Sequence, residues 1–217
     1  MEKSEETMPK IIGKTMNRKI GLISSAIHLC SVVGFAFCLL VSANIGNYFF
    51  GMFIAFSFIP LISAFAMYSK SDNKAAAYTA MIFAGIYSVF ILLVYFAQVT
   101  TVQLGLLNEQ AAQIISSQKF GLFFNYDLLG YGIMALATFF AGLTIDGKTG
   151  STKCLKLLLM IHGVFFISSF ILPVSGVFST DLSSEQSNKI GPMIQTFWCI
   201  YFSIIDIYSF LYFKRQI

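Results

Sequence analysis

Long apolar stretches separated by short polar segments run through this sequence. A helix needs about 20 mostly apolar residues to cross a membrane, because it rises ~1.5 Å per residue through a hydrocarbon core of ~30 Å. Six stretches meet this requirement, and they cover residues 20–43, 49–69, 75–98, 127–146, 154–178 and 191–213. The pattern predicts an all-α membrane protein, a bundle of six transmembrane helices that forms one domain over residues 1–217.

The composition agrees with this prediction and excludes other classes of protein. Hydrophobic residues make up 57% of the 217 positions and charged residues only 11%, whereas soluble domains are about 25% charged. An ordinary soluble enzyme and a disulfide-rich secreted domain are therefore excluded. No cysteine falls in an outer connection, so we expect free thiols. The cysteines are Cys30, Cys38, Cys154 and Cys199.

The lysines and arginines predict the orientation of the chain. Of the 14, five lie in segment 1–19, two follow the second span, three lie between the fourth span and the start of the fifth, and two are C-terminal. The opposite connections hold only Lys119 and Lys189. Because cytoplasmic segments carry the excess of Lys and Arg, we expect a multi-pass protein of the cell membrane with segment 1–19 and both termini in the cytoplasm. The net charge of +4 then reflects this orientation, and no nucleic-acid partner is expected.

The longest connection, residues 99–126, is expected on the outer face. Apolar residues recur in it at near-helical spacing, at Leu104, Leu107, Ala111, Ile114 and Ile115. Polar residues fill much of the rest. This spacing predicts an outer amphipathic helix, which serves either as a packing cap on the bundle or as a lid over a substrate site.

Three ionisable side chains fall well inside predicted spans, namely His28, His162 and Asp206. Counted from the flanking lysines at ~1.5 Å per residue, each lies roughly 9–14 Å from the cytoplasmic edge. The only two histidines and the only deeply placed acid are thus predicted to share one layer. Ionisable groups inside a membrane are costly and usually functional, so these three residues form the candidate site.

Polar residues line one face of the helices that carry these groups. Ser31 follows His28 by one turn, and Ser203 precedes Asp206 by one turn. Polar faces turn away from lipid toward neighbouring helices or a cavity. Ser31 and Ser203 are therefore added to the candidate ligands.

Three interpretations of this layer are open. It is structural, or it is a protonatable relay, since an Asp–His pair in a low dielectric can hold a proton near neutral pH. Alternatively it is a metal site, because two His and one carboxylate can hold iron or zinc with an open position. No other cofactor is predicted. Asp127 and Asp146 lie near the ends of the fourth span, where we expect solvated helix ends.

Motifs of soluble enzymes find no support. Residues 142–149 match the phosphate-loop pattern G-x-x-x-x-G-K-[ST] by letter, but that pattern needs a strand that leads a glycine-rich loop into a helix N-terminus. Here it lies at the C-terminal end of a predicted span, so we interpret it as a helix end followed by a cytoplasmic Lys148. The sequence contains no His-Glu-x-x-His, Gly-x-Ser-x-Gly or Cys-x-x-Cys motif.

The leading hypothesis is a small transporter or permease-like subunit. Its polar pathway would be lined by the first, fifth and sixth spans, with the candidate residues binding or relaying a proton or cation. Pro60 and Pro173 would give local helix flexibility. Six spans are few for a solitary carrier, so a homo-oligomer or a partner membrane subunit is expected in the bilayer. The alternatives are an intramembrane enzyme that uses the same residues as a metal or acid–base site, and a non-catalytic scaffold, sensor or immunity-type protein.

Overall fold

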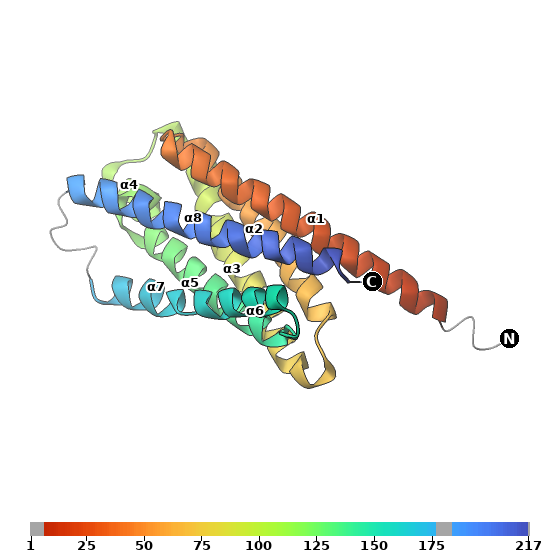
Figure 1. Ribbon diagram of the computed structural model, residues 1–217. Coiled ribbons are helices and arrows are strands. Elements are labelled where there is room, and N and C mark those ends of the chain that lie inside the picture. The colour runs from red at the N-terminus through yellow and green to blue at the C-terminus, as the bar shows by residue number, and fades with distance from the viewer. Residues whose placement is uncertain (1–6, 177–183, 217) are drawn as a thin grey trace.

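The computed structural model describes the backbone of residues 7–176 and 184–216, and the side chains of residues 15–176 and 192–216. Every regular element in these ranges is helical (Figure 1). The α-helices are α1 (Thr7–Leu40), α2 (Asn44–Met67), α3 (Lys74–Thr100), α4 (Glu109–Ile115), α5 (Leu122–Thr144), α6 (Gly150–His162), α7 (Phe165–Val174) and α8 (Ser184–Lys214). The 3-10 turns η1 (Ser71–Asn73), η2 (Val102–Leu104) and η3 (Ser117–Lys119) lie in the connections.

In the described part of the chain, six helical segments are long and apolar enough to cross a membrane, which confirms the predicted all-α bundle of six apolar helices. They are Thr15–Leu40, Asn44–Met67, Ser71–Leu104, Leu122–Thr144, Gly150–Val174 and Pro192–Lys214. Helix α1 begins and α8 ends at the same end of the bundle (Figure 1). We call this end, which also holds the α2–α3 and α5–α6 connections, the Lys-rich end. The opposite end, which holds α4, is the loop end.

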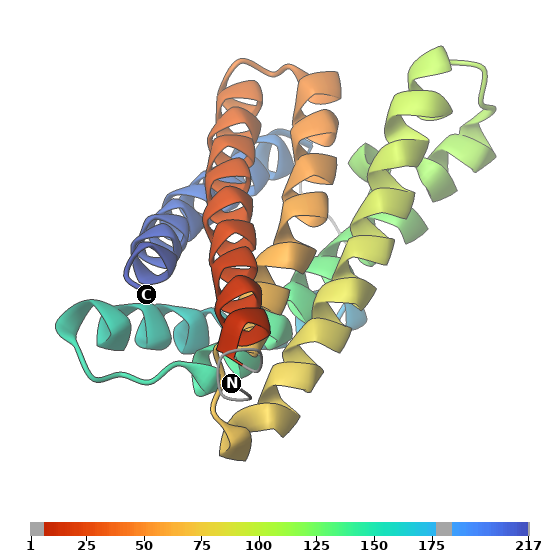
Figure 2. The same cartoon turned by 90° about the vertical axis from the view of Figure 1, so that its right-hand side faces the viewer.

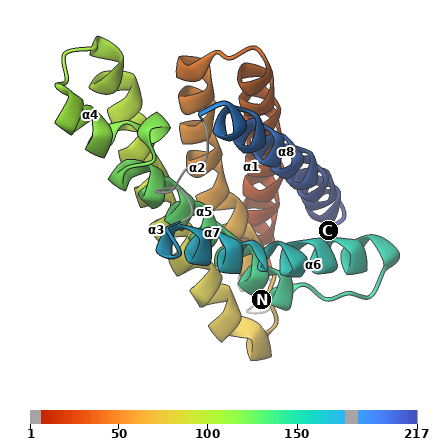
Figure 3. The same cartoon turned by 90° about the vertical axis from the view of Figure 1, so that its left-hand side faces the viewer.

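Helices α2 and α5 form the centre of the bundle. Helix α2 packs against α1 and α3, and α5 packs against α3, α6 and α7. Helix α8 lies against α1 and α6 (Figures 2 and 3). In the most apolar part of each span, 61% of the α5 residues are buried but only 11% of the α6–α7 residues. The α6–α7 span therefore lies at the periphery of the bundle, where most of its side chains are not covered by other helices.

Aromatic rings fill the contacts between these helices. The ring of Phe58 in α2 lies 5.2 Å from that of Tyr87 in α3 and 6.3 Å from that of Phe202 in α8. All three side chains are buried. Because lipid is as apolar as these side chains, close packing and interhelical hydrogen bonds hold such a bundle together.

Two helices begin earlier than the sequence predicts. Helix α1 begins at Thr7 and therefore includes most of segment 1–19. Helix α8 begins at Ser184, so Pro192 lies inside it rather than in its first turn. Hydropathy marks the part of a helix that lies in lipid, and polar residues continue the same helix beyond that part.

The fifth span is not one continuous helix. Helix α6 ends at His162 and α7 begins at Phe165, and the amide nitrogens of Gly163 and Val164 bond to carbonyls three residues back. A Cβ on Gly163 would lie 2.8 Å from Cβ of Phe139 in α5, so the glycine permits a close approach to α5. Pro173 lies in the last turn of α7, away from this break. Pro60 lies inside α2, which continues past it to Met67.

The loop-end connection contains less helix than predicted. Only α4, with seven residues, is α-helical, and the 3-10 turns η2 and η3 flank it. The predicted single amphipathic helix is interrupted by Gly105, which has a left-handed φ of 66°, and by Asn108. The side chain of Asn108 accepts a hydrogen bond from the amide of Ala111 and so begins a new helix there.

Charged side chains join the connections at the Lys-rich end. Oδ2 of Asp146 lies 2.9 Å from Nζ of Lys70 and 3.2 Å from Nζ of Lys148. The hydrogen bonds from Lys70 and Lys148 lower the pKa of Asp146 below its ordinary value. Its side chain is 41% exposed, as predicted for this solvated helix end.

We expect the Lys70→Ala variant to raise the pKa of Asp146 toward the ordinary aspartate value of about 3.9. Because the folded-state pKa lies below the unfolded value, the ion pairs stabilise the fold fully above the unfolded pKa and lose this effect as pH falls through the folded pKa. A carbon-13 NMR titration of the Asp146 carboxyl group in micelles measures the shift. Lys153→Ala is the control, and equal titration curves for both variants would contradict the assignment.

Candidate functional site

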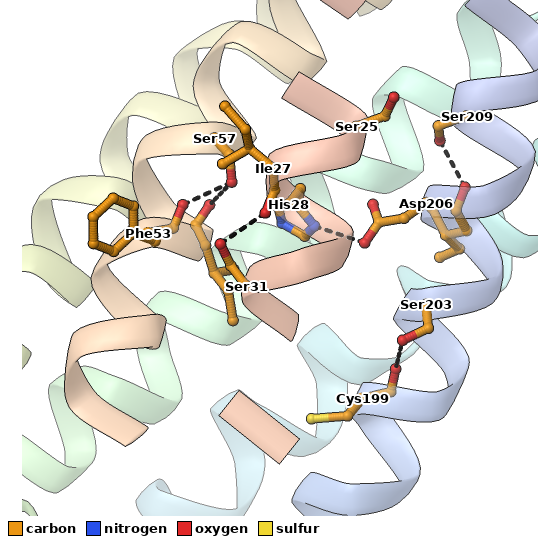
Figure 4. A network of polar contacts seen from close by, with 12 residues as sticks. Ser25, Ile27, His28, Ser31, Phe53, Ser57, Cys199, Ser203, Asp206 and Ser209 are labelled. Atoms are coloured by element: carbon orange, nitrogen blue, oxygen red, sulfur yellow. Dashed lines mark hydrogen bonds and ion pairs between the residues drawn. The ribbon is translucent and has the colours of Figure 1, made fainter. Parts of the chain in front are cut away.

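A buried polar contact joins α1 to α8. Nδ1 of His28 lies 2.8 Å from Oδ2 of Asp206 (Figure 4). Both side chains have an exposed fraction of 0%. Since α1 and α8 pack against each other, the pair crosses a helix interface away from water. The structure thus brings together two of the three ionisable residues predicted to share a layer.

Each member of this pair has one polar atom without a partner. Nε2 of His28 and Oδ1 of Asp206 are buried and accept or donate no hydrogen bond. The rings of Phe58 and Phe202 lie 5.8 Å and 5.0 Å from the imidazole. A buried polar atom without a partner costs about 1–3 kcal/mol and is rare in native proteins. These two atoms are therefore the unsatisfied polar groups of the pair.

The pair can hold either one proton or two. With one proton between Nδ1 and Oδ2, the His28–Asp206 pair has a net charge of −1. A second proton on Nε2 or on Oδ1 makes the pair neutral, and a neutral pair costs less to keep in a low dielectric. The arrangement therefore has two buried atoms, Nε2 of His28 and Oδ1 of Asp206, at which a second proton would neutralise the pair.

The two serines predicted as ligands lie on the correct faces but bond within their own helices. Oγ of Ser31 donates to the carbonyl oxygen of Ile27 at 2.7 Å, and Oγ of Ser203 donates to that of Cys199 at 2.7 Å (Figure 4). Each is one turn from its ionisable neighbour. Their hydroxyl protons are therefore used by backbone carbonyls, and among the described side chains neither serine is hydrogen-bonded to the pair.

His162 belongs to a different cluster. The indole Nε1 of Trp198 donates to Nε2 of His162 at 3.1 Å. Nδ1 of His162 lies 2.7 Å from Oγ1 of Thr138, and that hydroxyl donates to the carbonyl oxygen of Ala135 at 2.9 Å. Both ring nitrogens of His162 therefore have hydrogen-bond partners, and the side chain is buried with an exposed fraction of 1%.

The direction of these bonds defines the tautomer of His162. Indole can only donate, so Nε2 of His162 must be unprotonated and Nδ1 must carry the proton. A second proton on Nε2 would point at the N–H of Trp198. The geometry therefore favours a neutral, structural histidine that links α5, α6 and α8.

A phenylalanine separates the two histidines. The ring of Phe202 lies 5.0 Å from the His28 ring and 5.2 Å from the His162 ring. Among the described residues, no group of three or more His, Cys, Asp or Glu side chains is arranged to hold a metal ion. The three candidate ligands thus occupy two neighbouring positions in one layer of the bundle.

The sequence interpretation missed Asp127, which is buried with an exposed fraction of 8% rather than solvated. Its Oδ1 atom has no hydrogen-bond partner. Helices α2, α3 and α4 and the turn η3 pack against α5, and Asp127 interacts electrostatically with Tyr48 of α2 and Tyr95 of α3. The available signal was the four-residue spacing of Asp127, Tyr131 and Ala135, which places the acid on the inward face of its helix.

A pocket at the Lys-rich end lies away from these polar clusters. Its volume is about 120 Å³, and it is lined by Thr149, Ser151, Thr152, Tyr208, Tyr212, Arg215 and Gln216. Thr149 is the last residue of the segment 142–149 that matches the phosphate-loop pattern by letter. It caps α6 by accepting a hydrogen bond from the amide of Thr152. Nη1 of Arg215 donates to Oγ of Ser151. The polar groups of this pocket thus bind one another and hold α8 against the start of α6.

Comparison of the chain with protein-family models, with curated proteins and with solved structures finds no match.

Proposed function

We propose that this protein is a small proton-coupled transporter or permease-like subunit in which the His28–Asp206 pair is the proton-binding site. The observation that carries the proposal is the fully buried pair with one free polar atom on each side chain. Ionisable groups in this position are typical of proton relays in membrane transporters. His162 and its partners then serve as the rigid wall beside the site.

The distribution of charge gives this site a direction. We place the Lys-rich end in the cytoplasm, because that end carries most of the Lys and Arg residues of the chain. Asp206 lies eight residues before Lys214, which corresponds to roughly 12 Å along α8. Protons leaving the pair toward the Lys-rich end therefore have the shorter distance to travel. The cell membrane is the location that agrees with this orientation.

A peripheral helix favours assembly as part of the proposed function. Every described side chain of α7 is at least partly exposed, and only 11% of the residues in the most apolar part of the α6–α7 span are buried. A second copy or a partner subunit could cover this face.

A scaffold function would use the same polar contacts only to fix helix register, and it requires no proton exchange at the pair.

The test is a pH step applied to proteoliposomes adsorbed on a solid-supported membrane. Proton binding inside the protein moves charge and gives a transient current. We expect Asp206→Asn and His28→Gln each to reduce this current, because each removes one side of the shared proton site. Asp146→Asn is the matched control, since that carboxylate is exposed and paired with lysines, and it should retain the current.

Folding must be checked in the same preparations by circular dichroism and size-exclusion chromatography. Folded Asp206→Asn and His28→Gln proteins that retain the wild-type current would overturn the proposal. The pair would then be a structural contact between α1 and α8, as the scaffold hypothesis requires.

A further inference from the structure

A second buried carboxyl group lies near the loop end of the bundle. Asp127 is six positions into α5, roughly 8 Å from its first residue, and is 8% exposed. Oδ1 of Asp127 has no hydrogen-bond partner. No ion pair of the described side chains includes Asp127. This carboxyl group therefore has neither a cation nor a complete set of hydrogen bonds.

Tyrosine side chains from three helices surround Asp127. Tyr95 of α3 and Tyr131 of α5 have hydroxyl oxygens 3.2 Å apart, and both interact electrostatically with Asp127. Tyr87 also does so, and its buried hydroxyl has no partner. Tyr48 of α2 packs on Tyr95 with ring centroids 5.5 Å apart. The cluster thus supplies hydroxyl groups that can accept or donate a hydrogen bond, and no positive charge.

The connection after α4 closes the loop end of this tyrosine cluster. Oγ of Ser117 lies 2.9 Å from the hydroxyl of Tyr48, and the amide of Ser117 donates to Oε1 of Gln98 at 3.1 Å. Nε2 of Gln98 donates to the carbonyl oxygen of Ile115 at 2.9 Å. Gln98 is 2% exposed. Two charged side chains near this end, Glu109 at the start of α4 and Lys119 in the connection, are exposed to solvent.

Aromatic side chains separate Asp127 from the His28–Asp206 pair. The rings of Tyr131 and Trp198 lie 5.3 Å apart, and those of Trp198 and Phe202 lie 5.1 Å apart. Phe202 then contacts His28. These contacts are ring packing, so the two carboxyl groups occupy distinct sites in the two halves of the bundle.

We propose that Asp127 is a second proton-binding site, which exchanges protons with the solution at the loop end beneath the connection 115–119. A carboxylate withdrawn from water without a cation is strongly unfavourable, and a proton on Asp127 removes the charge while supplying a donor for a neighbouring hydroxyl. The binding step is the addition of one proton to the carboxylate, and release is its reversal. The site stands on its own geometry and does not require proton binding at His28–Asp206.

The test is infrared difference spectroscopy of the full-length protein in proteoliposomes between two pH values. The reading is the carbonyl band of a protonated carboxylic acid. We expect Asp127→Asn to lose one such band that Asp206→Asn retains, so the two sites are scored separately. Asp146→Asn should retain it as well. If the Asp127→Asn spectrum shows the same carboxylic-acid bands as the wild-type spectrum, the proposal is overturned, whatever happens at Asp206.

A second variant keeps the test decisive if Asp127→Asn does not fold. Tyr95→Phe leaves Asp127 in place and removes a hydroxyl next to it, so the band should shift in frequency. Tyr126→Phe is the matched control, since Tyr126 is on the same helix as Asp127 but is 39% exposed. In this variant the carboxylic-acid band of Asp127 should not shift. Equal spectra for the two tyrosine variants would also contradict the site.

Discussion

His28→Leu is expected to lower the free energy of unfolding by about 3–5 kcal/mol, the usual effect of removing one partner from a buried ion pair. The reason is that Asp206 is 0% exposed and would lose its one side-chain hydrogen bond to the described part of the chain. Unfolding of the protein in bicelles, followed by steric trapping, measures the change.

Two further variants separate the loss of the pair from the loss of the side chain. The double variant His28→Leu, Asp206→Leu should be closer to wild type than the single variant, because no polar group is then left alone in the interface. Ser203→Ala is the control on the same helix face and should change stability by less than about 0.5 kcal/mol. A double variant that is no more stable than His28→Leu would show that the two side chains are not energetically coupled.

Gly51→Ala is expected to destabilise the protein by about 1–3 kcal/mol, the usual cost of inserting a carbon into a packed core. A Cβ at Gly51 of α2 would overlap the ring of Tyr95 in α3. The ring has little room to move, because Tyr95 is 2% exposed and its hydroxyl bonds to Tyr131. The same variant should therefore also disturb the polar cluster around Asp127, visible as a shift of its carboxylic-acid band.

Gly85→Ala provides the matched control for this prediction. Gly85 also lies in a membrane helix, and a Cβ there would meet no atom within 4 Å. Replacing it should stabilise the protein by about 0.4–1 kcal/mol, because alanine restricts the unfolded chain more than glycine does. Equal effects of the two substitutions would mean that the close approach of α2 to α3 carries no energetic weight.

The candidate site was partly predictable from the chain alone. The distances of His28 and Asp206 from their flanking lysines placed both in one layer, and the structure shows them in contact. The same count placed His162 in that layer without revealing its partners, Thr138 and Trp198. Depth along a helix follows from residue number, whereas the direction of a side chain follows from the rotation of each helix against its neighbours.

The burial of Asp127 shows the limit of that reasoning. Its position near the start of a span predicted a solvated helix end, and Asp146 at the other end of the same helix does behave that way. The difference arises because α2, α3 and the segment around Ser117 pack near Asp127, whereas Asp146 lies beside the exposed side chains of Lys70 and Lys148. The helical spacing that places Asp127 on the inward face of α5 continues through Thr138 and Gly142 to Asp146. The local sequence therefore does not distinguish these two surroundings.

The sequence by itself determined the number of spans, their approximate extent and the layer that holds the ionisable groups, because the thickness of a membrane and the rise of a helix leave few alternatives. Only the tertiary structure decided which polar atoms meet. Pairing of His28 with Asp206, the bonds around His162 and the enclosure of Asp127 all depend on contacts between residues that are distant in the chain. Such contacts result from the packing of small and aromatic side chains across whole helices, and this packing is a property of the assembled bundle rather than of any one span.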